Sequence, residues 1–227
     1  VMEARYILKS PVFLVLLVVA FAFTLPSLLS ASGFLNTALY PITFALVPLI
    51  HDSFRPLLVI VATYYAGELT WRERERNVHE IIDATPLPSW ALMLPKILGL
   101  AAVLFMTLLT GVMVAVLIQL LDGAVDIAPR NYLLWLLLPG VVDALLIAVL
   151  AVFVQALSPG KYAGWCVMVV YALALFFGPS FGLEHPLMLY GSVPAVSPSD
   201  MAGSGIAWKA AWWFRTFWAS TALLLLV

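Results

Sequence analysis

Long apolar segments separated by short polar ones recur along the whole chain. The first begins at Ser10 and Pro11, an N-cap followed by proline at the first helical position, and continues to about Ala31 without a charge. A helix needs about 20 mainly apolar residues to cross a membrane. The pattern therefore predicts an all-α, polytopic transmembrane helix bundle in a single module over residues 1–227, with about six spans at about 11–31, 54–70, 91–121, 132–157, 162–181 and 213–227.

Two of these spans have unusual ends. The apolar sequence between Phe34 and Trp71 is longer than one crossing needs, and its first part, Pro41 to Ile50, is too short to cross alone. That part is either a re-entrant turn or the outer extension of the same helix. The last span starts at an aromatic and basic girdle, and from Thr216 only a dozen residues remain, about 18 Å of helix. Because this is shorter than a crossing and residue 1 is Val rather than Met, we expect the chain to be a fragment.

The most polar stretch lies between the second and third spans. Seven formal charges fall between Arg72 and Asp83, where Val78, Ile81 and Ile82 are spaced as one apolar face of a helix. Prolines end this stretch, so we predict a separate, short amphipathic helix on the cytoplasmic surface. It is either a solvated helix that anchors the loop or a docking helix for a cytoplasmic partner, because alternating charges give specificity of contact.

Lysine and arginine residues predict the orientation of the bundle. With six spans and a cytoplasmic N-terminus, seven of them fall inside: Arg5, Lys9, Arg72, Arg74, Arg76, Lys96 and Lys161. Four fall outside: Arg55, Arg130, Lys209 and Arg215. An extra crossing near Pro41 to Ile50 would reduce this difference to six against five.

The composition excludes several other classes of protein. Hydrophobic residues make up 64% of the chain and charged residues only 10%, whereas soluble domains have about 25% charged residues. A net charge of −1 offers no basic field to attract nucleic acid. Cys166 is the single cysteine, which excludes an intrachain disulfide and a cysteine-based metal site.

Few polar residues are candidates for chemistry. Asp143 lies near the middle of the fourth span, where a carboxylate either handles protons or substrate or fixes helix packing. The second alternative is favoured, because the sequence offers it no second intramembrane acid or base. Glu68, at the inner end of the second span, has Arg72 at i+4 as a neutralising partner. A scattered outer group either lines a substrate exit or docking surface or is simply solvated: His51, Asp52, Arg55, Glu184, His185 and Asp200.

No catalytic or metal site is predicted. The run from His79 to Asp83 has Asp where a zinc-protease helix needs a second histidine. The G-x-S-x-G nucleophile elbow and the phosphate-binding G-x-x-x-x-G-K-[ST] loop do not occur either. This chain therefore holds no cofactor of its own, and any ATP would be bound and hydrolysed by a partner chain.

Two groups of residues carry a resemblance to a known family. The run Tyr65 to Glu75, followed by Glu80 to Ala84, Pro86 to Trp90 and Lys96, resembles the membrane domain of type 2 ABC exporter permeases. A second group resembles the permease half that precedes a zinc aminopeptidase domain in fused bacterial membrane proteins: Tyr190-Gly191, Ser199-Asp200-Met201, Gly203-Ser204-Gly205, Trp213-Phe214-Arg215 and Trp218. Ala202 departs from that pattern, which has Asn there. The peptidase domain is absent, so neither its activity nor its zinc is carried over.

The resemblance implies a permease subunit of an ATP-driven exporter in the bacterial inner membrane. Its partners would be an ABC ATPase subunit, a second permease half or a second copy of this chain, and the lipid bilayer. In that family the segment after the second span is a coupling helix, which points to these residues: Glu68, Arg72, Glu73, Arg74, Glu75, Glu80, Asp83, Pro86 and Pro88. The alternatives are a membrane anchor for an aminopeptidase domain without transport, and an intramembrane enzyme that uses Asp143.

Overall fold

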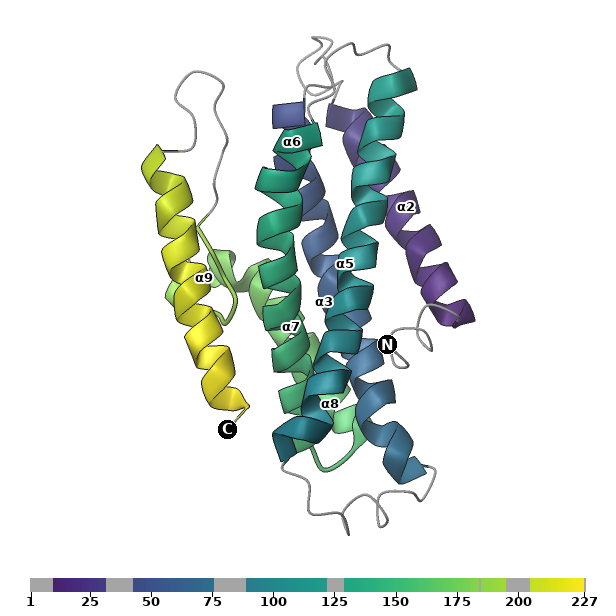
Figure 1. Ribbon diagram of the computed structural model, residues 1–227, viewed down its shortest axis with the longest axis vertical. Coiled ribbons are helices and arrows are strands. Elements are labelled where there is room, and N and C mark those ends of the chain that lie inside the picture. Colours follow the sequence, from purple (N-terminus) through teal and green to yellow (C-terminus); the bar gives the residue numbers. More distant parts are fainter. Residues whose placement is uncertain are drawn as a thin grey trace.

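A computed structural model of the chain describes residues 10–31, 43–75, 89–121, 129–183, 185–194 and 205–226. Within these ranges the chain is helical and contains no strand, and the long helices lie side by side along one axis (Figure 1). The long α-helices are α2 (Pro11–Ala31), α3 (Thr43–Glu75), α5 (Ser89–Leu121), α7 (Leu138–Leu157), α8 (Lys161–Phe177) and α9 (Gly205–Leu225). The short elements are α6 (Pro129–Tyr132), the π-helix η1 (Leu133–Leu137), and the 3₁₀-helices η2 (Gly178–Phe181) and η3 (Pro186–Met188).

Four of the described segments are long and apolar enough to cross a membrane: Leu46–Glu75, Ala91–Leu121, Pro129–Leu157 and Lys161–Phe181. They agree with the expectation of an all-α transmembrane bundle, and the last three match the predicted spans to within a few residues. The first and sixth predicted spans fall on the helices α2 and α9, which are not among these four. The count of six therefore stays a prediction.

The second span is longer than predicted at both ends. Residues from Thr43 onward form one continuous helix with the predicted span, so the described part of the earlier segment is an extension of that helix and not a re-entrant turn. Pro48 and Pro56 lie inside this helix. At its C-terminal end, Arg72 to Glu75 form its last turn and do not begin a separate helix. The rest of the predicted amphipathic helix, with Glu80, Asp83, Pro86 and Pro88, lies outside the described residues.

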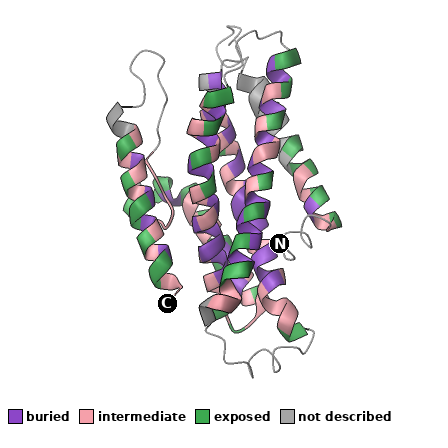
Figure 2. Ribbon diagram, viewed as in Figure 1, coloured by how far each residue is buried: buried purple, intermediate pink, exposed green. Residues whose placement is uncertain are grey.

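The core of the bundle lies between α3, α5 and α7. Buried side chains follow helical spacing along each of them, so every helix turns one apolar face inward: Ile50, Phe54, Tyr65 and Leu69 in α3, Leu100 and Leu104 in α5, and Ala148 and Ala151 in α7. Figure 2 shows this buried face along the centre of the bundle. Helix α2 packs against α3 and α5, α8 against α3 and α7, and α9 against α7. Helix α3 therefore contacts most of the other long helices.

Glycines allow α8 to approach its neighbours closely. A Cβ atom at Gly67 of α3 would overlap the indole of Trp165 in α8, and one at Gly164 of α8 would overlap the side-chain amide of Gln155 in α7. Side chains larger than hydrogen at these two positions would force the helices apart. The two glycines therefore set how closely α8 packs on the bundle.

Residues 185–194, which follow α8 along the chain, are held by side chains of α8 and α9. The Tyr171 hydroxyl of α8 donates to the Tyr190 carbonyl oxygen at 2.7 Å, and the Trp218 indole of α9 donates to the Ser192 carbonyl oxygen at 2.8 Å. The backbone turns at Gly182 and Gly191, which have φ angles of 83° and 68°, a region that favours glycine. This segment therefore joins α8 and α9 on one side of α7.

Candidate functional site

Charged side chains gather at two places in the bundle, one near each end of α3. At its C-terminal end, three carboxylates of α3 face two lysines near the starts of α5 and α8. Lys161 Nζ lies 2.6 Å from Glu68 Oε1 and 3.1 Å from Glu75 Oε1, and Lys96 Nζ lies 2.8 Å from Glu73 Oε2. We call these five residues the ion-pair cluster.

Helical geometry explains which carboxylate meets which lysine. Glu68 and Glu75 are seven residues apart and share the face of α3 that packs on α8, whereas Glu73 points to α5. The lysine side chains are largely buried, with 14% exposure for Lys161 and 11% for Lys96. The cluster thus joins the end of α3 to the beginnings of two other helices.

The sequence predicted Arg72, at i+4, as the neutralising partner of Glu68. The structure adds the Lys161 ammonium of α8, which lies on Glu68 and also on Glu75. Lys96 of α5 is buried against Glu73. Both lysines come from helices other than α3, so spacing along α3 does not reveal them.

Aromatic contacts attach the same end of α3 to α7. The Trp71 indole N–H donates to Gln155 Oε1 at 3.0 Å, and the Arg74 guanidinium lies 4.8 Å above the Trp71 ring. Of the predicted coupling residues, Glu68, Glu73 and Glu75 therefore make ion pairs within the bundle, and Arg72 and Arg74 lie beside them on the last turns of α3.

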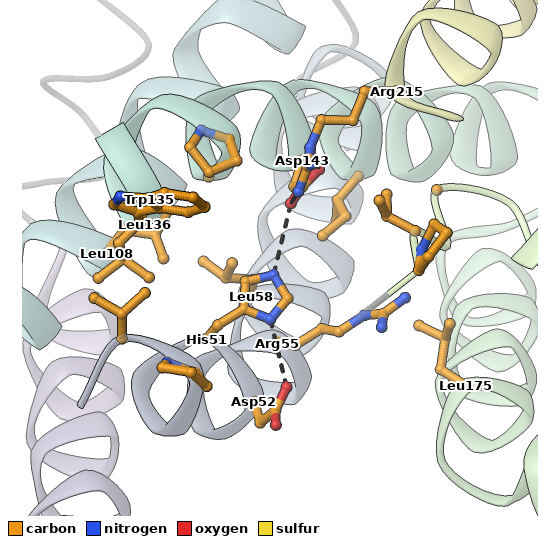
Figure 3. Close-up of a pocket in the computed structure, with 18 of the residues that line it drawn as sticks. His51, Asp52, Arg55, Leu58, Leu108, Trp135, Leu136, Asp143, Leu175 and Arg215 are labelled. Atoms are coloured by element: carbon orange, nitrogen blue, oxygen red, sulfur yellow. Dashed lines mark hydrogen bonds and ion pairs between the residues drawn. The ribbon is translucent and has the colours of Figure 1, made fainter. Parts of the chain in front are cut away.

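The second charged group lines a cavity of about 230 Å³ between α3, α7, α8 and α9, which we call the bundle cavity. Its polar side chains are His51, Asp52, Arg55, Asp143 and Arg215 (Figure 3). Its apolar wall comes from α3, α5, η1, α7 and α8 and includes Leu58, Leu108, Trp135, Leu136, Ile147 and Leu175. The cavity thus combines a strongly polar side with a strongly apolar one.

Asp143 and Arg215 form the shortest ion pair of the bundle cavity. Arg215 Nε donates to Asp143 Oδ1 and Nη2 to Oδ2, both at 2.9 Å, so the guanidinium holds both carboxylate oxygens at once. The side chains are 16% and 7% exposed, respectively. His51 Nε2 lies 3.7 Å from Asp143 Oδ2 on the other side. The expectation that Asp143 has no intramembrane partner was therefore wrong, because α9 brings a cation to it.

The remaining cavity charges are held more loosely. His51 Nδ1 lies 3.4 Å from Asp52 Oδ1, and the Asp52 side chain is 84% exposed at the cavity rim. Arg55 points into the cavity and donates from Nη2 to Ser192 Oγ at 3.4 Å. Its position on α3 and this contact connect α3 to the segment before α9.

The outer group predicted from the sequence is only partly brought together. His51, Asp52 and Arg55 line the bundle cavity. His185 lies elsewhere, where its Nδ1 accepts a hydrogen bond from the Leu187 backbone N–H at 3.2 Å and its ring lies beside Phe214. Glu184 and Asp200 lie outside the described residues. Of its described members, three therefore line the cavity and one lies on a separate loop.

Arg215 is the functional-site residue that the sequence did not assign correctly. It was placed at the outer interface because the sixth span was expected to begin near residue 213. Helix α9 begins at Gly205, so Arg215 lies about 15 Å into a 21-residue helix. The sequence did contain a signal for this contact. Asp143 and Arg215 carry opposite charges near the middle of helical segments, and burying either charge without a partner in a membrane costs free energy.

The described residues contain no group of three or more His, Cys, Asp or Glu side chains arranged to hold a metal ion. Cys166 is exposed on α8 and its thiol is free. The geometry of both sites instead suits ion pairing and binding of charged groups. Comparison of the chain with known protein families and with curated proteins gives no match.

Proposed function

We propose that this chain is a permease module of an ATP-driven exporter in the bacterial inner membrane. It has six spans and a cytoplasmic N-terminus, and it works with a second permease half or a second copy of itself. Separate ABC ATPase subunits bind and hydrolyse ATP. Their movement enters the bundle through the inner end of α3 and the segment that follows it, about Arg72 to Ala84.

The ion-pair cluster is the observation that carries this proposal. Lys161 holds α8 to α3, Lys96 holds α5 to α3, and Trp71 holds α7 to α3. A displacement of the chain just after Glu75 therefore reaches four helices together, which is what rigid-body opening of a helix bundle requires. Partly buried ion pairs suit this role because they fix geometry more than they add stability.

The distribution of charge supports the proposed orientation. Arg72, Arg74, Lys96 and Lys161 lie at the same end of the described bundle, while Arg130 lies at the opposite end of the Pro129–Leu157 segment. Cytoplasmic ends of membrane helices carry the excess of lysine and arginine. The end that carries the ion-pair cluster is thus the end that an ATPase would reach.

Site-specific cross-linking tests the proposal. A Glu75→Cys variant in a Cys166→Ser background carries a photoreactive maleimide at an exposed position, while Glu68 keeps Lys161 in place. We expect illumination of cells to link the chain to a protein that contains the G-x-x-x-x-G-K-[ST] loop. Arg130→Cys, which is exposed at the other end, is the matched control and should give no such product.

A folded Glu75→Cys chain that gives no product with an ATPase, or the same product from Arg130→Cys, would overturn the coupling proposal. A membrane anchor for a fused aminopeptidase domain predicts the first of these outcomes, since an anchor needs no contact with an ATPase.

A further inference from the structure

We propose that the bundle cavity binds an amphiphile that carries a single anionic group, a carboxylate or a phosphate. The anionic group would lie on the Arg55 guanidinium, and the hydrocarbon part would lie along the wall formed by η1, α7 and α8. This inference goes beyond the coupling role, and it needs no ATPase, because binding is a property of this chain alone.

Arg55 is the cavity residue that points to a ligand, because no described carboxylate pairs with it. A guanidinium has several N–H donors and always carries a charge. Among the described residues it has one hydrogen-bond partner, the neutral Ser192 hydroxyl at 3.4 Å, and no carboxylate at ion-pair distance. It lies about 18 Å along α3 from Thr43, within the candidate membrane span Leu46–Glu75, where a cation is normally paired. Three features of the cavity show what kind of partner would fit.

The other charges of the cavity are already engaged. Both oxygens of Asp143 are held by Arg215, which makes that pair neutral. Asp52 lies at the exposed rim and contacts His51. Asp52 is one helical turn from Arg55 on α3, but its carboxylate contacts His51 at the rim, so Arg55 is the cavity arginine that no described carboxylate contacts at ion-pair distance. A ligand with one negative charge balances it, whereas a cation would meet an unpaired guanidinium.

The wall opposite the polar groups is apolar and aromatic. Trp135 and Leu136 come from η1, Ile147 from α7 and Leu175 from α8. The Trp135 ring is fixed by Trp208 of α9, with ring centroids 4.5 Å apart. Ordered aromatic and aliphatic side chains beside a few polar groups are typical of small-molecule sites. Such a wall favours a hydrocarbon chain over a hydrated inorganic ion.

The size of the cavity limits what it can hold. At about 230 Å³ it is smaller than the range of roughly 300–1,000 Å³ for drug-sized ligands. It therefore fits an anionic head with a short length of chain, and the rest of a longer molecule would extend past the half-buried His51 and the exposed Asp52 at the rim. A medium-chain carboxylate is the simplest molecule with this chemistry.

Equilibrium binding of radiolabelled decanoate to the purified full-length chain in phosphatidylcholine nanodiscs tests the site. We expect Arg55→Gln to weaken decanoate binding by about tenfold or more, because hydrogen bonds to charged groups are lost. Arg130→Gln, an exposed arginine outside the cavity, should bind as the unchanged chain does. Unlabelled decanoate should displace the probe, and decanol, which lacks the charge, should displace it poorly.

Two further arms distinguish the source of the anionic group. Replacing part of the phosphatidylcholine by phosphatidylglycerol will lower decanoate binding if lipid headgroups occupy the site from the bilayer. Unchanged binding in those discs, with displacement by inorganic phosphate, supports the same site filled from water. Equal decanoate binding by Arg55→Gln and the unchanged chain, or equal displacement by decanol, would overturn the proposal.

A measurement on the unsubstituted chain covers the case in which Arg55→Gln does not fold. Phenylglyoxal modifies arginines, and peptide mass spectrometry can follow Arg55 and Arg130 separately. Decanoate should slow modification of Arg55 and leave that of the exposed Arg130 unchanged, while decanol should protect neither. Modification of Arg55 at the same rate with and without decanoate would contradict the proposal. Because no ATPase is present in these experiments, that result would leave the coupling proposal untouched.

Discussion

At the scale of single residues, the bundle depends on charges that meet partners from distant helices. Asp143 and Arg215 are 72 positions apart, and each is largely buried. Separating them would leave one charge without its counterion in a place of low polarity, which is far more costly than replacing both by apolar side chains. The pair therefore attaches α9 to α7 and specifies its register.

We predict that Asp143→Ala destabilises the chain by about 3–5 kcal/mol, because Arg215 is left buried without its counterion. Replacing both residues, with Asp143→Leu and Arg215→Met, should recover much of this loss. Thermal unfolding of the variants in detergent measures the effect. Asp52→Asn, a change at an 84% exposed carboxylate, is the control and should alter stability by about 0.5 kcal/mol or less. If Asp143→Ala were no less stable than Asp52→Asn, the pair would not attach α9.

The sequence was sufficient to single out Asp143 but not its partner. A lone carboxylate within an apolar run is visible in the sequence itself. The identity of its partner depends on where α9 begins and on which helix it packs against, and both are properties of the tertiary structure. Similarly, His51, Asp52 and Arg55 were visible as polar residues, but nothing in their spacing shows that they face a cavity.

At the scale of elements, α3 organises the bundle. It contacts α2, α5, α7 and α8, and its C-terminal end is fixed by ion pairs. Its N-terminal part was missed by the predicted span 54–70, because Pro48 and the polar residues near His51 resemble a loop. Mean hydropathy does not distinguish polar side chains in a loop from polar side chains that line an internal cavity, so the helix was predicted too short.

Loss of Lys161 should loosen the contact between α8 and α3. Lys161→Met leaves Glu68 and Glu75 without their shared cation, so we expect amide hydrogen exchange in the first half of α8 to become about tenfold faster. Mass spectrometry of exchanged peptides measures this. Lys209→Met, an exposed change in α9, should leave α8 as it was. Unaltered exchange in Lys161→Met would mean that the ion-pair cluster does not hold the two helices together.

The close packing of α8 on α3 predicts how glycine-to-alanine substitutions change the stability of the chain. Replacing a helical glycine by alanine normally stabilises a helix by up to about 1 kcal/mol. At Gly67 the added methyl group would overlap Trp165, so we expect Gly67→Ala to lower the melting temperature in spite of the better helix propensity. Gly160→Ala has open space around the new methyl group and should be close to neutral. A higher melting temperature for Gly67→Ala would contradict this close contact.

At the scale of the whole molecule, the chain has two different ends. The ion-pair cluster lies at one end of α3, and the bundle cavity lies toward the other. Spans three to five were predicted well, because short polar segments interrupt the apolar sequence on both sides of each. The placement of α9 and the contents of the cavity were not predicted, since both arise from contacts between helices far apart in the sequence.

The central claim is that the end of α3 with the ion-pair cluster faces the cytoplasm, because ATPase coupling and the outer position of the cavity both depend on it. Labelling of single cysteines with a membrane-impermeant maleimide in intact spheroplasts tests this claim, in the Cys166→Ser background. We predict that Arg130→Cys is labelled from outside, whereas Glu75→Cys is labelled only after the membrane is permeabilised. Labelling of Glu75→Cys in intact spheroplasts, with Arg130→Cys protected, would contradict the account.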